Sequence, residues 1–136
     1  VGLFGLPKKV QYYPNLAENG VDTSGILIME YPDFQAVCTA AKDSTSDPFV
    51  IIQAEDGTIV YPERPGYVRY GERYDRLTNL TEEIDVVAED DPMKNEFLYI
   101  QEIIDTKNTE QMNVWLEKST MTVAVLEQAL QSISKG

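Results

Sequence analysis

The residues best suited to chemistry in this chain are few, and three of them lie together. Lys42, Asp43 and Ser44 form a charged, hydroxyl-bearing trio directly after an apolar segment, and the polar residues 45–48 follow. A lysine beside an acid at the end of a strand can orient a polar substrate, although such trios also commonly turn a chain and keep it soluble. We therefore take Lys42, Asp43 and Ser44 as candidate substrate-cleft residues.

The other reactive side chains indicate no catalytic centre. The chain has no histidine, which excludes a Ser-His-Asp triad, a Cys-His pair and histidine metal ligands within it. The one cysteine, Cys38, lies in the apolar residues 36–41, which predicts a buried, inert thiol. The acids at 89–91 are contiguous, whereas a calcium loop spaces its ligands alternately, so we interpret them as solvated. We predict no catalytic residue and no metal site.

Composition narrows the classes of partner and cofactor. A net charge of −12 argues against nucleic acid and anionic membranes, because both require a clustered cationic surface. No G-x-G-x-x-G motif follows a predicted strand, so we expect this chain to bind no dinucleotide by itself. It has neither an apolar run of about 18 residues nor a signal peptide, which predicts a cytoplasmic protein.

The elements that position the trio are predicted to be strands first and helices last. A strand over residues 8–16 ends in a turn at Gly20, and residues 24–31 and 34–41 form a hairpin. A second hairpin joins 49–54 to 58–61 through Asp56-Gly57, a step that can adopt the positive φ of a tight turn. We expect two further short strands at 67–70 and 75–80.

Helical periodicity begins at Pro92, which follows two acids and suits a first helical turn. A second helix runs to the end of the chain. This order predicts an α+β fold with a mostly antiparallel open sheet and helices packed on one face. The apolar stripe of the first helix is Met93, Phe97, Ile100 and Ile104, and that of the second is Trp115, Ser119, Thr122, Val123, Leu126, Leu130 and Ile133.

The predicted strands are apolar on both faces. Four consecutive apolar residues occur at 26–29 and again at 49–52, whereas a sheet with one wet face alternates apolar and polar residues. Two helices can cover one face only. Either the sheet closes into a barrel or sandwich, or a partner surface covers the second face, and we favour a second copy of this chain. The candidate interface residues are Ile26, Ile28, Val37, Val50 and Ile52.

The order of several short motifs resembles the C-terminal domain of the Gfo/Idh/MocA oxidoreductases over nearly the whole chain. The motifs are residues 21–25, Tyr31-Pro32-Asp33, Lys42-Asp43-Ser44, residues 52–59, Glu96-Phe97, Trp115, Ser119 and residues 125–127. Ala54 departs from the glycine that the family often has there, which weakens assignment to a subfamily.

The resemblance implies that residues 1–136 are the C-terminal half of a two-domain enzyme. The N-terminal Rossmann domain, absent from this chain, would bind NAD or NADP and carry the catalytic lysine, aspartate and histidine. The family commonly assembles through its open sheet, and it acts on sugars, polyols and related hydroxy compounds. The alternative reading is a stand-alone α+β module for dimerisation or small-ligand binding.

Overall fold

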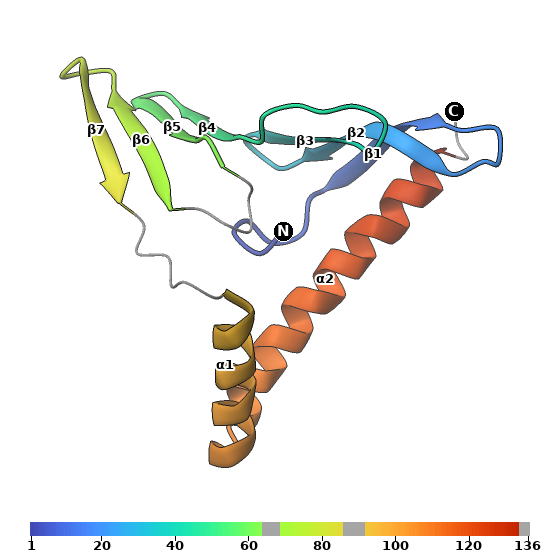
Figure 1. Ribbon diagram of the computed structural model, residues 1–136, viewed down its shortest axis with the longest axis vertical. Coiled ribbons are helices and arrows are strands. Elements are labelled where there is room, and N and C mark those ends of the chain that lie inside the picture. The colour runs from blue at the N-terminus through green and yellow to red at the C-terminus, as the bar shows by residue number, and fades with distance from the viewer. Residues whose placement is uncertain (64–68, 86–91, 134–136) are drawn as a thin grey trace. The chain divides into compact units, whose positions relative to one another are not determined.

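The computed structural model describes residues 1–63, 69–85 and 92–133. Within these ranges, strands come first and two helices last (Figure 1), which confirms the predicted α+β fold with antiparallel pairing. The strands are divided between two sheets, and the chain forms two compact units: a first unit, Val1–Thr45 with Thr106–Gly136, and a second unit, Ser46–Asp105. The elements are β1 (Lys9–Leu16), β2 (Asp22–Glu30), β3 (Gln35–Ala41), β4 (Val50–Ala54), β5 (Gly57–Tyr61), β6 (Tyr70–Asp75), β7 (Leu80–Asp85), α1 (Pro92–Thr106) and α2 (Thr109–Ile133).

The first sheet is an antiparallel meander in the order β1-β2-β3. The predicted turn at Gly20 joins β1 to β2, and Gly20 has a φ of 80°, a conformation that glycine adopts without strain. The predicted hairpin of β2 and β3 is also confirmed, with Ile28 opposite Val37. Directly opposed residues share a face, so Val10 and Met29 lie on one face, while Ile28 and Val37 lie on the other.

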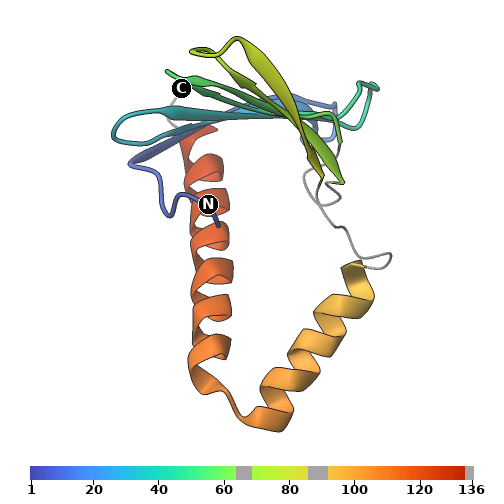
Figure 2. The same cartoon turned by 90° about the vertical axis from the view of Figure 1, so that its left-hand side faces the viewer.

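Helix α2 packs against the face of the first sheet that carries Val10 and Met29. Figures 1 and 2 show that its C-terminal end meets the sheet while its N-terminal half extends away. Val125 is 3% exposed and Ala129 is 5% exposed, and both belong to the same buried cluster as Val10, Met29 and Tyr31. Because these two helical side chains are small, the helix can lie close to β1. This cluster is the core of the first unit.

The outer edge of β1 is protected by α2. The Ser132 hydroxyl accepts a hydrogen bond from the backbone N–H of Tyr12 at 2.9 Å and donates one to the carbonyl oxygen of Ala129 at 2.6 Å. Two residues beyond Tyr12, Pro14 has no N–H to offer to another strand. Unpaired edge groups are templates for association with other chains, and at these two positions β1 offers no free N–H to another strand.

The side of α2 that is buried differs from the predicted one. The predicted stripe runs through Val123, Leu126 and Leu130, and these side chains are all more than half exposed. Val125 and Ala129 are buried instead. The pattern of large aliphatic residues therefore identified the helix correctly but was wrong about its contact with the sheet, because close approach selects small side chains.

The second sheet has the order β4-β5-β6-β7 and is antiparallel throughout. The predicted β4–β5 hairpin is confirmed, with Ala54 opposite Gly57. Gly57, however, does not have the positive φ that was expected. A Cβ atom at this position would lie 2.0 Å from the carbonyl oxygen of Tyr74. Glycine is therefore required here by the close approach of β6 and not by the conformation of the turn.

The last two strands, β6 and β7, each end five residues later in the chain than predicted. The prediction of two short strands at 67–70 and 75–80 is wrong for the described residues 69–80. These residues form β6, a turn and the start of β7. The Asp75 carboxylate accepts hydrogen bonds from the backbone N–H groups of Leu77 and Thr78, each at 2.9 Å. Asn79, with a φ of 57°, completes the turn. A turn therefore occupies the second predicted strand.

The two helices follow each other closely. Helix α1 begins at Pro92, as predicted, and the acids at 89–91 lie outside the described residues. Lys107, with a φ of 52°, ends α1, and the Asn108 side chain caps α2 by accepting the Gln111 N–H at 3.1 Å. Over the described ranges, neither helix is long and apolar enough to cross a membrane. The predicted stripe of α1 is exposed at Met93, Phe97, Ile100 and Ile104.

Candidate functional site

The structure brings one member of the predicted trio, Lys42, into a polar network. Lys42 directly follows β3, and its N–H donates to the carbonyl oxygen of Thr23 at 2.7 Å. Its Nζ lies 3.6 Å from Oδ1 of Asp22 and 3.4 Å from the Asp22 carbonyl oxygen. Asp43 and Ser44 are exposed and belong to none of the hollows described below. The structure therefore joins Lys42 to Asp22 and not to its neighbours in sequence.

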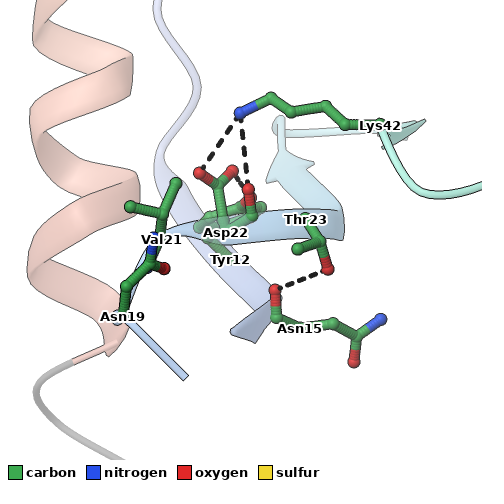
Figure 3. A network of polar contacts seen from close by, with 7 residues as sticks. All are labelled: Tyr12, Asn15, Asn19, Val21, Asp22, Thr23 and Lys42. Carbon is green, nitrogen blue, oxygen red and sulfur yellow. Dashed lines mark hydrogen bonds and ion pairs between the residues drawn. The ribbon is translucent and has the colours of Figure 1, made fainter. Parts of the chain in front are cut away.

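Tyr12 completes the network from a third strand, as Figure 3 shows. Its hydroxyl donates to Oδ2 of Asp22 at 2.7 Å. This hydrogen bond, followed by the charge of Lys42, lowers the pKa of Asp22, and the same bond raises the pKa of Tyr12. The Asp22 carboxylate is therefore held ionised between a neutral hydroxyl and an ammonium group.

The network borders a hollow of about 220 Å³ on the first sheet. Gly25 shapes the hollow, because a Cβ there would lie 2.5 Å from Cε2 of the Tyr12 ring. The small or apolar side chains of Leu27, Cys38 and Ala40 also line it. The remaining lining residues are the polar Asp22, Thr23, Ser24 and Lys42, together with Ala41.

Cys38 is exposed, so the prediction of a buried thiol is wrong. Cys38 lies opposite Leu27 and therefore on the face of the sheet that α2 approaches. The helix packs on β1, however, and the face of β3 receives no comparable contact. The apolar sequence around Cys38 correctly indicated a strand, but it could not show how far the helix would cover the sheet.

A larger hollow of about 540 Å³ lies between β1 and α2. Its polar lining consists mainly of amide and ammonium side chains, and it contains none of the predicted site residues. The smaller hollow pairs a carboxylate with an ammonium group, so it offers both acceptors and donors to a ligand. Among the described residues, no group of three or more acidic or cysteine side chains is placed to hold a metal ion. We therefore take the smaller hollow as the candidate site, a place suited to binding polar groups. The lining of the larger hollow is Lys8, Lys9, Val10, Gln11, Tyr12, Tyr13, Gln128, Gln131 and Ser132.

The sequence did not identify Tyr12 or Asp22 as site residues. They are separated from Lys42 by 30 and 20 positions, and only the register of the first sheet brings them together. One signal was available: Gly25 lies inside a strand, directly before the apolar residues 26–29, and an isolated glycine in a strand often marks a close approach by another group. Here that group is the Tyr12 ring.

The candidate interface residues lie on shared faces within their own sheets. Ile26, Ile28 and Val37 lie on the face of the first sheet opposite α2, where Val37 is 60% exposed. Val50 and Ile52 share a face of the second sheet. The role of these residues in assembly stays a prediction.

Comparison with known proteins relates the chain to oxidoreductases. No family model matches it. Its fold is similar to a crystal structure from Klebsiella pneumoniae provisionally assigned to the oxidoreductases, with a TM-score of 0.76 and 16% identity over 99% of this chain and 44% of the other. In sequence it is 42% identical over 60 residues to the uncharacterised oxidoreductase YgjR of Escherichia coli K12, covering 44% of this chain and 18% of that protein. The chain is an α+β segment with homology to oxidoreductases.

A second sequence similarity extends along nearly the whole chain to one particular dehydrogenase. Over 134 residues the chain is 35% identical to scyllo-inositol 2-dehydrogenase (NADP(+)) IolU of Bacillus subtilis strain 168. The match covers 95% of this chain and 39% of that enzyme. The chain therefore spans well under half of the length of the curated relatives that it matches.

Proposed function

We propose that residues 1–136 are the C-terminal, substrate-side and assembly domain of an NAD(P)-dependent oxidoreductase of the Gfo/Idh/MocA type, acting on a sugar, polyol or related hydroxy compound. The observation that carries this proposal is the 35% identity to an NADP-dependent inositol dehydrogenase across 95% of the chain. The parent enzyme would transfer hydride from a carbinol carbon to the nicotinamide and release a proton, leaving a carbonyl product. Both the cofactor site and the proton acceptor would lie outside this chain.

The hollow beside Lys42 would hold hydroxyl groups of the substrate. The Asp22 carboxylate can accept hydrogen bonds from hydroxyl groups, and the Lys42 ammonium has three donors, of which two are directed at Asp22 oxygens over rather long distances of 3.4 and 3.6 Å. Adjacent hydroxyls on a polyol offer one donor and one acceptor at the spacing of such a pair. The apolar side chains of Leu27 and Ala40 would contact the carbon skeleton.

The uncovered face of the first sheet would assemble with another copy of the chain. Ile26 and Val37 are 45% and 60% exposed on a face that α2 does not cover, and contiguous exposed aliphatic side chains commonly mark an interface. A two-fold contact would bring this face against itself. Light scattering at micromolar concentration should therefore give at least a dimer, and a monomer of the expected mass would contradict this part of the proposal.

The enzymatic part is tested on the full-length protein by following NAD+ and NADP+ reduction with inositols, glucose and other polyols. Lys42→Met should raise the KM for the polyol by roughly 10- to 150-fold, since hydrogen bonds to charged groups are worth about 1.5–3 kcal/mol. The KM for the cofactor should stay unchanged. Lys118→Met, which removes a lysine from the exposed side of α2, is the matched control.

Two results would contradict the proposal. A full-length protein without nicotinamide-linked activity on any polyol would favour the stand-alone binding or dimerisation module. Binding of NADH or NADPH by the 136-residue chain alone, followed through the fluorescence of Trp115, would contradict the location of the cofactor site.

A further inference from the structure

One side of α2 presents large aliphatic side chains to solvent. We call Leu116, Val123, Leu126, Leu130 and Ile133 the outer stripe. Leu116, Val123, Leu126 and Leu130 are each more than half exposed, and Ile133 is 37% exposed. With Ser119 between the first two, these positions follow each other at intervals of three, four, three, four and three residues. A patch of this kind on a soluble domain normally marks a contact surface.

The first sheet does not provide this contact. The side of α2 that faces β1 is centred on Val125 and Ala129, which are almost fully buried. At 3.6 residues per turn, the outer stripe lies roughly a third of a turn around the helix from that side. Tyr12 and Ser132 already fix the helix on the strand. The outer stripe is thus a second surface of α2 and not a loosened part of the first.

The spacing indicates what kind of element would cover the outer stripe. Alternation of three and four residues is the spacing by which one helix packs along another in coiled coils and bundles. From Leu116 to Ile133 the stripe is about 26 Å long at 1.5 Å per residue, which corresponds to some five turns of a partner helix. A strand or loop would not match this repeat over such a length.

We propose that the outer stripe is the docking site for an amphipathic helix from the remainder of the parent polypeptide. This inference rests on the proposed function. In the inositol dehydrogenase and in the Klebsiella structure, the matched segment is 39% and 44% of the chain, so a larger part of each protein shares a polypeptide with this fold. A second copy bound at Ile26 and Val37 would lie on the face of the sheet opposite α2, and so would not reach the stripe.

Thiol labelling tests the proposal without reference to activity. In a Cys38→Ser background, Leu126→Cys is labelled with a maleimide in the 136-residue chain and in the full-length protein. Glu117→Cys, an exposed position on the side of α2 away from the stripe, is the matched control. We expect the labelling rate at position 126 to be at least about tenfold lower in the full-length protein, because a buried thiol reacts only when the structure opens locally. Position 117 should react equally in both.

Three results would overturn the proposal. The first is equal labelling of position 126 in the two proteins. The second is protection of position 126 in the 136-residue chain that disappears on dilution. Such concentration dependence would mean that a second copy of the chain covers the stripe. The third is a gene that encodes nothing beyond this chain. A full-length protein with a protected position 126 but no dehydrogenase activity would refute the proposed function alone.

Discussion

Val125→Ala is the substitution that most directly tests how the first unit is held together. Val125 is 3% exposed and belongs to the cluster in which α2 meets β1. The change deletes two methyl groups, which corresponds to about 1.6 kcal/mol of lost transfer free energy at ~0.8 kcal/mol per buried carbon. Incomplete collapse of the resulting cavity adds to this, so we expect a loss of about 2 kcal/mol in the free energy of unfolding.

The matched control is Val123→Ala, two residues away on the exposed side of the same helix. Val123 is 54% exposed, so its truncation should change the free energy of unfolding by no more than about 0.5 kcal/mol. Both substitutions replace valine by alanine inside α2, so the gain in helix propensity is the same in each and cancels in the comparison. The difference between the two variants therefore measures burial alone.

Urea unfolding of the 136-residue chain, followed by circular dichroism at one protein concentration, is a suitable assay. For an m-value of about 2 kcal/mol/M, the midpoint should fall by about 1 M for Val125→Ala and hardly move for Val123→Ala. Equal losses in the two variants would refute the packing of α2 on β1 described above. A greater loss for Val123→Ala would mean that the sheet contacts the outer stripe instead.

Three further predictions concern single residues. Gly57→Ala should destabilise the second sheet by about 1–3 kcal/mol in the same assay, because the new Cβ would lie 2.0 Å from a backbone oxygen of β6. Gly2→Ala should be neutral, since no atom lies within 4 Å of a Cβ at that position. Because the pKa of Asp22 is lowered in the folded state, the ionised Asp22 carboxylate stabilises the fold at a pH above its unfolded pKa of about 3.9. This stabilisation is lost as the pH falls through the folded pKa. Asp22→Asn should therefore lower the urea midpoint at pH 7 and converge with the wild type once the pH is below the folded pKa of Asp22, whereas a constant difference would contradict the shift. The hydrogen bond to Glu72 raises the pKa of Tyr70 to about 12, so difference spectra against Tyr70→Phe should show ionisation near that pH, and Glu72→Gln should lower it toward about 10.

The parts of the fold that could be predicted from sequence are those with local signals. Gly20 and the hairpin at Asp56 and Gly57 mark turns, and Pro92 marks the start of α1, so the first five strands and both helices lie close to their predicted positions. The last two strands could not be predicted, because β6 and β7 contain charged residues at consecutive positions and lack apolar alternation. Their boundaries depend on pairing within the second sheet and on the turn at Asp75.

The candidate site was predictable only in part, for a related reason. Lys42 stands out because it follows an apolar strand, and this is visible in one segment of the sequence. Tyr12 and Asp22 belong to the site through strand pairing, which a single segment does not report. The side of α2 that packs on the sheet was also missed. The small side chains of Val125 and Ala129 allow close contact with β1, whereas the outer stripe carries the larger aliphatic residues on which the prediction was based.

The bonded edge of β1 bears on how the first sheet resists association with other molecules. With the Tyr12 amide bonded to Ser132 and no amide at Pro14, β1 has no free donor at these two positions for a strand from another molecule. The last turn of α2 thus acts as a cap against templated polymerisation. A chain shortened to end before Ser132 would lose this cap and would expose the Tyr12 amide to strands of other molecules, the kind of edge from which fibres grow.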